Sequence, residues 1–136
     1  MPSITSTIMG FTVYWESKPV SEDVFAKFIT LAKSVVRPSV EVEVMPATLA
    51  FNPPEDRGET FYVTKGDNGF HYCKTYKELY TADVLRCLIL MVELGMAYDI
   101  RADDDIGYLK ELNHVHTVCR LHTYNDQTEY FKSIGN

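Results

Sequence analysis

The 136-residue sequence lacks most of the short motifs that identify an activity directly. It has no C-x-x-C pair, no H-E-x-x-H, no G-x-S-x-G and neither of the glycine-rich phosphate-binding loops. Zinc sites, serine hydrolases and dinucleotide-binding enzymes of the common kinds are therefore not expected. We expect no metal and no cofactor.

A secretory signal and a long apolar run are also missing. The first ten residues place no basic residue before an apolar stretch, so we expect the mature chain to begin near Met1. The longest apolar block, residues 84–96, contains Arg86 and Glu93 and is shorter than the roughly 20 residues that span a bilayer. This block predicts a buried helix and no contact with a membrane.

Cysteine is scarce and irregularly placed. Cys73, Cys87 and Cys119 are odd in number and far apart, which is not typical of a disulfide framework. The sequence also has no N-x-S/T site for glycosylation. These features predict reduced thiols and a cytoplasmic protein.

Basic residues are fewer than acidic ones. The 13 Lys and Arg residues stand against 19 Asp and Glu, which gives a formal charge of −6 and an isoelectric point near 5.1. Because binding to a nucleic-acid backbone needs clustered positive charge, we expect no nucleic-acid partner. Apolar residues make up 46% of the chain, with nine Tyr and seven Phe, which is enough for one core. We therefore expect a single domain, residues 1–136.

Hydrophobic periodicity predicts the element order β-α-β-β-β-α-β-α. The expected strands lie within 8–16, 40–44 (with a continuation through 48–51 after a bend at Pro46), 60–64, 70–77 and 97–102, and the expected helices within 22–36, 82–96 and 106–124. Residues 114–124 also alternate, so a strand remains the alternative there. This order predicts an α+β fold, with a single mixed, mainly antiparallel sheet and helices on one face.

Polar residues mark the expected ends of these elements. Ser21 and Thr81 suit the N-cap positions of the first two helices, and Asp103 with the two aspartates that follow suits the start of the last. The glycines of residues 65–69 suit a hairpin turn, so we expect strands 60–64 and 70–77 to pair antiparallel. His116, Cys119 and the later His122 lie at steps of three, but we interpret them as ordinary residues of the last helix.

Alternation assigns each strand residue to one of two faces of the expected sheet. The apolar set is expected to face the helices: Phe11, Val13, Trp15, Val40, Val42, Val44, Phe61, Val63, Phe70 and Tyr72. The open face is then expected to carry Thr12, Tyr14, Glu16, Glu41, Glu43, Thr60, Tyr62, Thr64, His71, Cys73 and Thr75. Such a face is covered by water, by a second copy or another protein, or by a small ligand.

One short stretch, FHYCKTYK at residues 70–77, carries the reactive side chains. His71 is two residues from Cys73, about 6.6 Å between Cα atoms on one strand face, which is long for a base acting on a thiol. Lys74 is expected at the rim of the core, on the face opposite the thiol. Glu59, at the start of the preceding strand, is a second candidate base.

Residues 59–61, ETF, and 70–80, FHYCKTYKELY, resemble small bacterial and fungal proteins of uncharacterised function. Their pattern runs E-T-F and then F-x-F-C-K-T-x-x-K-P-Y-D before an apolar helix, and the resemblance covers residues 40–100. Cys73, Thr75 and Tyr80 match it together with the intervening lysine, whereas Leu79 replaces a proline and Thr81 an aspartate. The resemblance implies the α+β fold and no particular activity.

The function we predict from the sequence is a small binding module that uses the open face of its sheet. Its partner is expected to be a second copy of the chain, another protein or a small molecule. The candidate binding residues are Tyr14, Tyr62, His71, Cys73, Lys74 and Thr75. The alternative is a small enzyme with Cys73 as nucleophile and His71 or Glu59 as base.

Overall fold

The computed structural model describes residues 11–54, 57–104, 107 and 109–120, and the fold is α+β as predicted. Its elements are β1 (Thr12–Ser17), α2 (Glu22–Val35), β2 (Glu43–Met45), β3 (Thr48–Phe51), β4 (Phe61–Thr64), β5 (Gly69–Lys74), α3 (Thr81–Glu93) and β6 (Ala97–Ala102). Residues 109–120 are also helical, which confirms the helix and not the strand for residues 114–120; residues 121–124 lie outside the described part.

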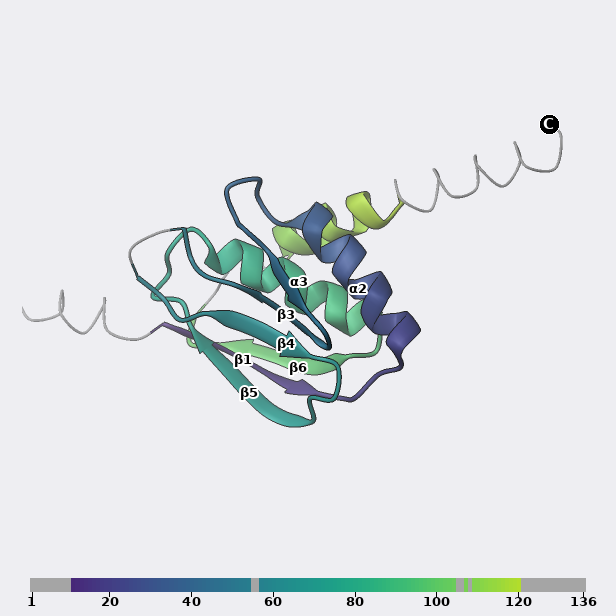
Figure 1. Ribbon diagram of the computed structural model, residues 1–136. Coiled ribbons are helices and arrows are strands. Elements are labelled where there is room, and N and C mark those ends of the chain that lie inside the picture. The colour runs from purple at the N-terminus through teal and green to yellow at the C-terminus, as the bar shows by residue number, and fades with distance from the viewer. Residues whose placement is uncertain (1–10, 55–56, 105–106, 108, 121–136) are drawn as a thin grey trace, which may run out of the picture.

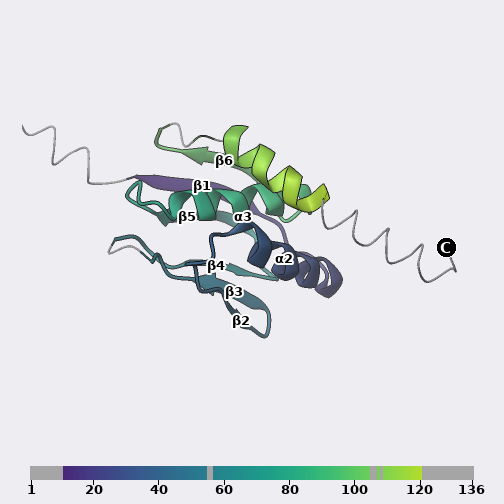
Figure 2. The same ribbon diagram turned by 90° about the horizontal axis from the view of Figure 1, so that it is seen from above.

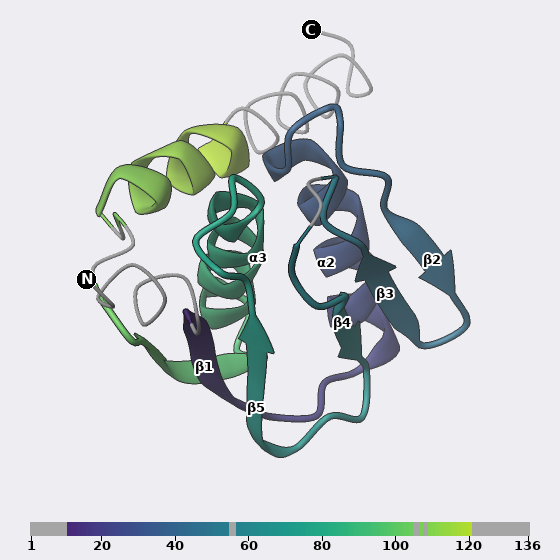
Figure 3. The ribbon, with the colours of Figure 1, turned by 90° about the vertical axis from the view of Figure 1, so that its left-hand side faces the viewer.

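The strands form two antiparallel sheets of three strands each, in the orders β5-β1-β6 and β2-β3-β4. The single mixed sheet predicted from the sequence is therefore wrong. The helices α2 and α3 lie on one side of both sheets, as Figure 1 and Figure 3 show. Seen from above in Figure 2, the sheets lie side by side under these helices, so both leave their other face uncovered by them.

The helix α2 begins and ends for local reasons that the sequence shows. The side chain of Ser21 accepts a hydrogen bond from the backbone N–H of Val24, the N-cap bond that was predicted. The residues Phe25, Phe28, Leu31, Ala32 and Val35 recur at helical spacing and are buried. Their burial against the sheets and α3 stabilises a helix whose other face is wet.

The helix α3 is buried on nearly every side, as its apolar sequence predicted. Its predicted N-cap is wrong, because Tyr80 holds that position and Thr81 lies inside the helix with a buried hydroxyl. Two of its charged residues have partners in the interior: Asp83 accepts from the backbone and Nε of Arg37, and Arg86 pairs with Glu111 of the last helix at 2.6 Å. No helix in the described residues is long and apolar enough to cross a membrane.

Residues 40–51 differ from the prediction. Only the end of the expected strand 40–44 is a strand, and the chain reverses at Ala47, which has a φ of 96°, to form the hairpin of β2 and β3. Val40 is buried, but Val44 is 44% exposed because β2 is the edge strand of its sheet. The sequence of residues 40–44 does alternate between apolar and acidic residues, but an edge strand has a neighbouring strand on one side only, so its apolar side chains are less buried.

Candidate functional site

The side chains of β5 face the opposite way from the prediction. Cys73 and Thr75 are buried and His71 is partly buried, whereas Phe70 and Tyr72 are 53% and 54% exposed. The reason is that β5 pairs with β1 in a register that sets Tyr72 beside Tyr14. Because side chains alternate along a strand, a shift of one residue in the register turns every side chain of the strand to the other face.

The exposed side of the two sheets is rich in aromatic rings. We call this side the outer aromatic face and define it by Tyr14, Tyr62, Phe70, Tyr72 and Tyr98. The ring of Phe70 lies 6.0 Å from that of Tyr14 and 6.2 Å from that of Tyr72, centroid to centroid. Tyr62 on β4 is 57% exposed and Tyr98 on β6 is 45% exposed. The predicted outward positions of Tyr14 and Tyr62 agree with this arrangement, since Tyr14 is partly exposed.

A groove of about 390 Å³ lies between β4 and β5. The residues that line it are Glu59, Thr60, Tyr62, Phe70, His71 and Tyr72. Small-molecule sites usually have volumes of about 300–1,000 Å³, so the groove is large enough for a compact ligand. In Figure 3 the two strands are seen edge to edge, with α2 and α3 behind them.

The edge of β5 that faces the groove has unused peptide groups. The backbone N–H of Lys74 donates to Oε1 of Glu59 at 2.9 Å and therefore points away from β1. In an antiparallel ladder such groups alternate, so the N–H and C=O of Phe70 and Tyr72 also point away from β1, toward β4. The predicted hairpin would have paired these groups.

β4 does not pair with these groups, because its hydrogen-bonded neighbour is β3 and the two strands belong to different sheets. The backbone N–H of Lys65 donates to the carbonyl of Ala47, and the same alternation turns the peptide groups of Phe61 and Val63 toward β3. The prediction that β4 and β5 pair is therefore wrong, and the groove is its consequence.

One end of the gap between β4 and β5 is closed by hydrogen bonds. The backbone N–H of Glu59 donates to the carbonyl of Lys74 at 2.9 Å. The hydroxyl of the fully buried Tyr80 donates to the carbonyls of both residues, at 2.8 and 3.1 Å. Gly58 passes so close to this ring that a β-carbon there would lie 2.6 Å from its Cε1 atom. Lys74 itself is exposed and not at the rim of the core as predicted.

Cys73 lies behind this closed end. Its thiol is 2% exposed, donates to the carbonyl of Glu59 at 3.6 Å and lies 3.9 Å from the hydroxyl of Tyr80. Burial, with a smaller contribution from the nearby charge of Glu59, raises the pKa of the Cys73 thiol to about 12, while the hydrogen bond with Tyr80 opposes the shift. A nucleophilic cysteine needs the opposite shift and access to a substrate, so this geometry does not favour the enzyme alternative.

His71 connects the groove to the core. Its ring stacks on Trp15 with centroids 5.9 Å apart, on the same side of β5 as the thiol. Its Nε2 atom is buried and makes no hydrogen bond with the described residues. The carboxylate of Glu59 contacts the backbone of Lys74, so neither candidate base approaches the thiol through a described hydrogen bond.

The charges of the outer aromatic face neutralise one another. Arg101 lies 3.4 Å from Asp99 and 3.9 Å from Glu16. Asp103, predicted to cap the last helix, instead accepts from the hydroxyl of Tyr14 at 2.8 Å and from the backbone N–H of Thr12 at 3.0 Å. The hydrogen bond to Asp103 is the main cause that raises the pKa of Tyr14.

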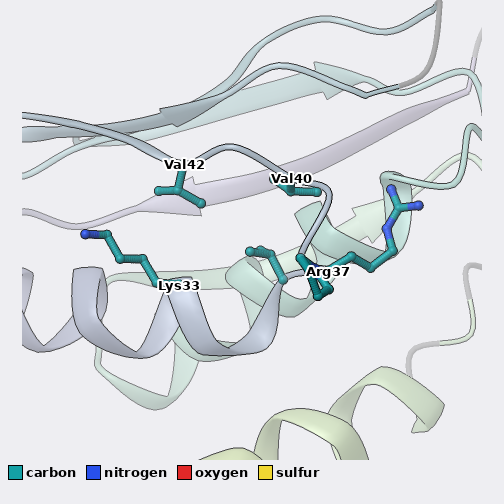
Figure 4. A pocket seen from close by; sticks show the side chains of 6 residues that line it. Lys33, Arg37, Val40 and Val42 are labelled. Atoms are coloured by element: carbon teal, nitrogen blue, oxygen red, sulfur yellow. The ribbon is translucent and has the colours of Figure 1, made fainter.

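A second hollow lies at the end of α2 and is shown in Figure 4. It has a volume of about 210 Å³ and is lined by Lys33, Val36, Arg37, Pro38, Val40 and Val42. Arg37 is held by Asp83 at 2.7 Å, so its charge is already partly compensated. This hollow is smaller than a typical ligand site. Among the described residues, no group of three or more His, Cys, Asp or Glu side chains could hold a metal ion.

Phe70 and Tyr72 were predicted to face the helices and instead lie on the surface. One feature of the sequence would have placed them correctly. Cysteine is among the residues most often buried, and threonine buries more readily than the neighbouring lysine. Placing Cys73 and Thr75 inside would have turned the two rings outward. No family model, curated protein or solved structure matches the chain, so the resemblance at residues 59–80 stays a prediction.

Proposed function

We propose that the protein is a binding module that uses its outer aromatic face and the groove within it. One observation carries the proposal. Tyr62, Phe70, Tyr72 and Tyr98 are each about half exposed on the side that the helices do not cover. Aromatic rings gain more from a partner surface than from water, and they are enriched at interfaces for that reason.

Three kinds of partner remain within this proposal: a second copy of the chain, another protein or a small molecule. A flat face of tyrosines suits either protein partner, and the groove of about 390 Å³ suits a small one. The alternative of an enzyme built on Cys73 gains no support, since its thiol is buried and its pKa is raised to about 12.

The proposal is tested by asking whether the exposed rings are needed for folding. We expect Phe70→Ser and Tyr72→Ser each to lower the free energy of unfolding by less than about 1 kcal/mol, the range of a cross-strand pair on a wet face. Urea denaturation measures this directly. Val13→Ser on the buried side of the neighbouring strand is the contrast, since Val13 is fully buried.

A loss of more than about 2 kcal/mol for each exposed ring would contradict the proposal, because that loss is typical of core residues. The rings would then serve the fold. A small loss leaves the rings without a structural role and supports a role in binding.

A further inference from the structure

We propose that the groove between β4 and β5 binds a quaternary ammonium group, carried by a compact small molecule that enters from the outer aromatic face. This inference rests on the proposed function and names the ligand class of the same site. The groove combines three aromatic walls with one carboxylate, and its six lining residues include no lysine or arginine.

The aromatic walls come from both strands. Tyr62 belongs to β4, and Phe70 and Tyr72 belong to β5, so the rings stand on two sides of the same space. The face of an aromatic ring carries partial negative charge, and it attracts a cation that lies within about 6 Å of its centroid. Several rings around one space form the aromatic cage that recognises methylated ammonium groups.

The charge in and around the groove also favours a cation. Glu59 is exposed and lines it, and Oε1 of its carboxylate accepts a hydrogen bond from the backbone N–H of Lys74. The chain as a whole carries a formal charge of −6. Three basic side chains near this face, Lys18 over the ring of Tyr98, Lys74 and Arg101, lie outside the lining of the groove, and Arg101 contacts Asp99.

The ends of the groove favour a compact ligand over an extended chain. At one end, within the turn that follows β4, the backbone N–H of Asp67 donates to the carbonyl of Thr64 at 3.0 Å. At the other end Glu59 and Lys74 are joined by hydrogen bonds. A peptide strand running between β4 and β5 would meet both closures, whereas a rounded head group of four carbons needs only the opening on the face.

A nucleobase could stack on the same rings, because base stacking on exposed tyrosines and phenylalanines of a sheet is a common mode of recognition. Such a ligand brings a phosphate, and phosphate is repelled by Glu59 in the lining and by the acidic charge of the chain. The acidic charge therefore favours a quaternary ammonium ligand over a nucleotide, and the experiment includes one ligand of each class.

The test compares choline with 3,3-dimethyl-1-butanol, which has the same shape and no charge. Each is titrated into the full chain, and the amide signals of Tyr62, Phe70 and Tyr72 are followed by two-dimensional NMR. We expect choline to bind about 5- to 30-fold more tightly than the neutral alcohol, the range that cation–π attraction supplies. Equal affinities, or binding of adenosine monophosphate but not of choline, would overturn the inference.

Three variants locate the site. Tyr72→Leu keeps an apolar side chain and removes a ring, and Glu59→Gln removes the charge but keeps an oxygen that can accept from Lys74. Both are expected to lower the preference for choline several-fold. Tyr98→Leu is the matched control, because Tyr98 is exposed on the same face but does not line the groove. A preference that survives both groove variants, or that falls equally in the control, would overturn the assignment.

A failure of this inference is distinguishable from a failure of the proposed function. If choline does not bind while the exposed rings prove dispensable for folding, the face remains a binding surface for another partner. If the rings prove necessary for folding, the binding surface itself is lost. Two quaternary ammonium ligands, free choline and a short peptide with trimethyllysine, separate a small ligand from a modified chain. Tighter binding of the peptide would overturn the compact ligand.

Discussion

The end of the gap between β4 and β5 at Glu59 and Lys74 differs from the rest of the gap in its hydrogen bonds. At the closed end, Glu59 and Lys74 exchange hydrogen bonds and the hydroxyl of Tyr80 joins both carbonyls. Along the rest of the gap, no ladder among the described residues joins β4 to β5, and the peptide groups of Phe70 and Tyr72 point away from β1 without a partner strand. The comparison teaches that a favourable turn sequence between two strands does not by itself make them pair.

The largest expected effect breaks the closed end. Gly58 has a φ of 123°, and an added β-carbon would lie 2.6 Å from Cε1 of the buried Tyr80. We expect Gly58→Ala to lower the free energy of unfolding by about 3 kcal/mol, the sum of backbone strain and overpacking. Gly66→Ala is the control, because nothing lies within 4 Å of its added carbon. Urea denaturation compares the two, and similar losses would contradict the packing described.

The next effect removes one hydroxyl from the closed end and one from the open face. Tyr80→Phe removes a hydroxyl that donates to the carbonyls of Glu59 and Lys74, each of which keeps another donor, so the variant is expected to cost about 1 kcal/mol of stability. Tyr72→Phe makes the same chemical change on a ring that is 54% exposed, and it is expected to change stability by less than about 0.5 kcal/mol. Thermal unfolding of both variants measures the two losses of stability, and equal losses would contradict the contrast between the closed end and the open face.

The third effect is on the pH dependence of stability. The Cys73 thiol has a pKa raised from 9.0 to about 12 in the fold, so the unfolded chain releases this proton first. Stability is therefore full below pH 9 and falls as the pH rises from 9 toward 12. Cys73→Ala is expected to make the fall shallower by about 1.4 kcal/mol per pH unit within that range. Denaturation midpoints between pH 8 and 11 measure the slope, and an unchanged slope would show an exposed thiol.

The smallest effect on stability tests self-association. Tyr62→Glu places a charge on a side chain that is 57% exposed, so folding is expected to change by less than about 0.5 kcal/mol. If the outer aromatic face joins two copies, the variant is expected to sediment as a smaller species than the wild type. A wild type that is already monomeric at micromolar concentration would exclude the dimer and leave the other partners.

Much of the fold was predictable because its signals are local. The cap at Ser21, the buried stripe of α2 and the apolar helix α3 follow from propensity and periodicity over a few turns. Strand existence was predicted for the same reason, including β6. The bounds failed mainly at β2, where an edge position leaves Val44 exposed in spite of its alternation.

The site was harder to predict because it depends on long-range pairing. Whether Phe70 or His71 faces the helices is decided by the register of β5 against β1, far away in the sequence. The stretch FHYCK alternates equally well in both directions, so periodicity alone gives no answer. The split between the sheets depends on which edge of β4 is bonded to β3, and no local pattern carries that information.

Amide hydrogen exchange along β5 tests the central claim, which is that the edge of β5 facing β4 is unpaired. In the structure, His71 and Cys73 point their N–H groups toward β1, whereas Phe70 and Tyr72 point theirs into the groove. We predict slow exchange at His71 and Cys73 and fast exchange at Phe70 and Tyr72. Uniformly slow exchange at all four positions would mean that β4 and β5 pair, and it would contradict the groove and the ligand site built on it.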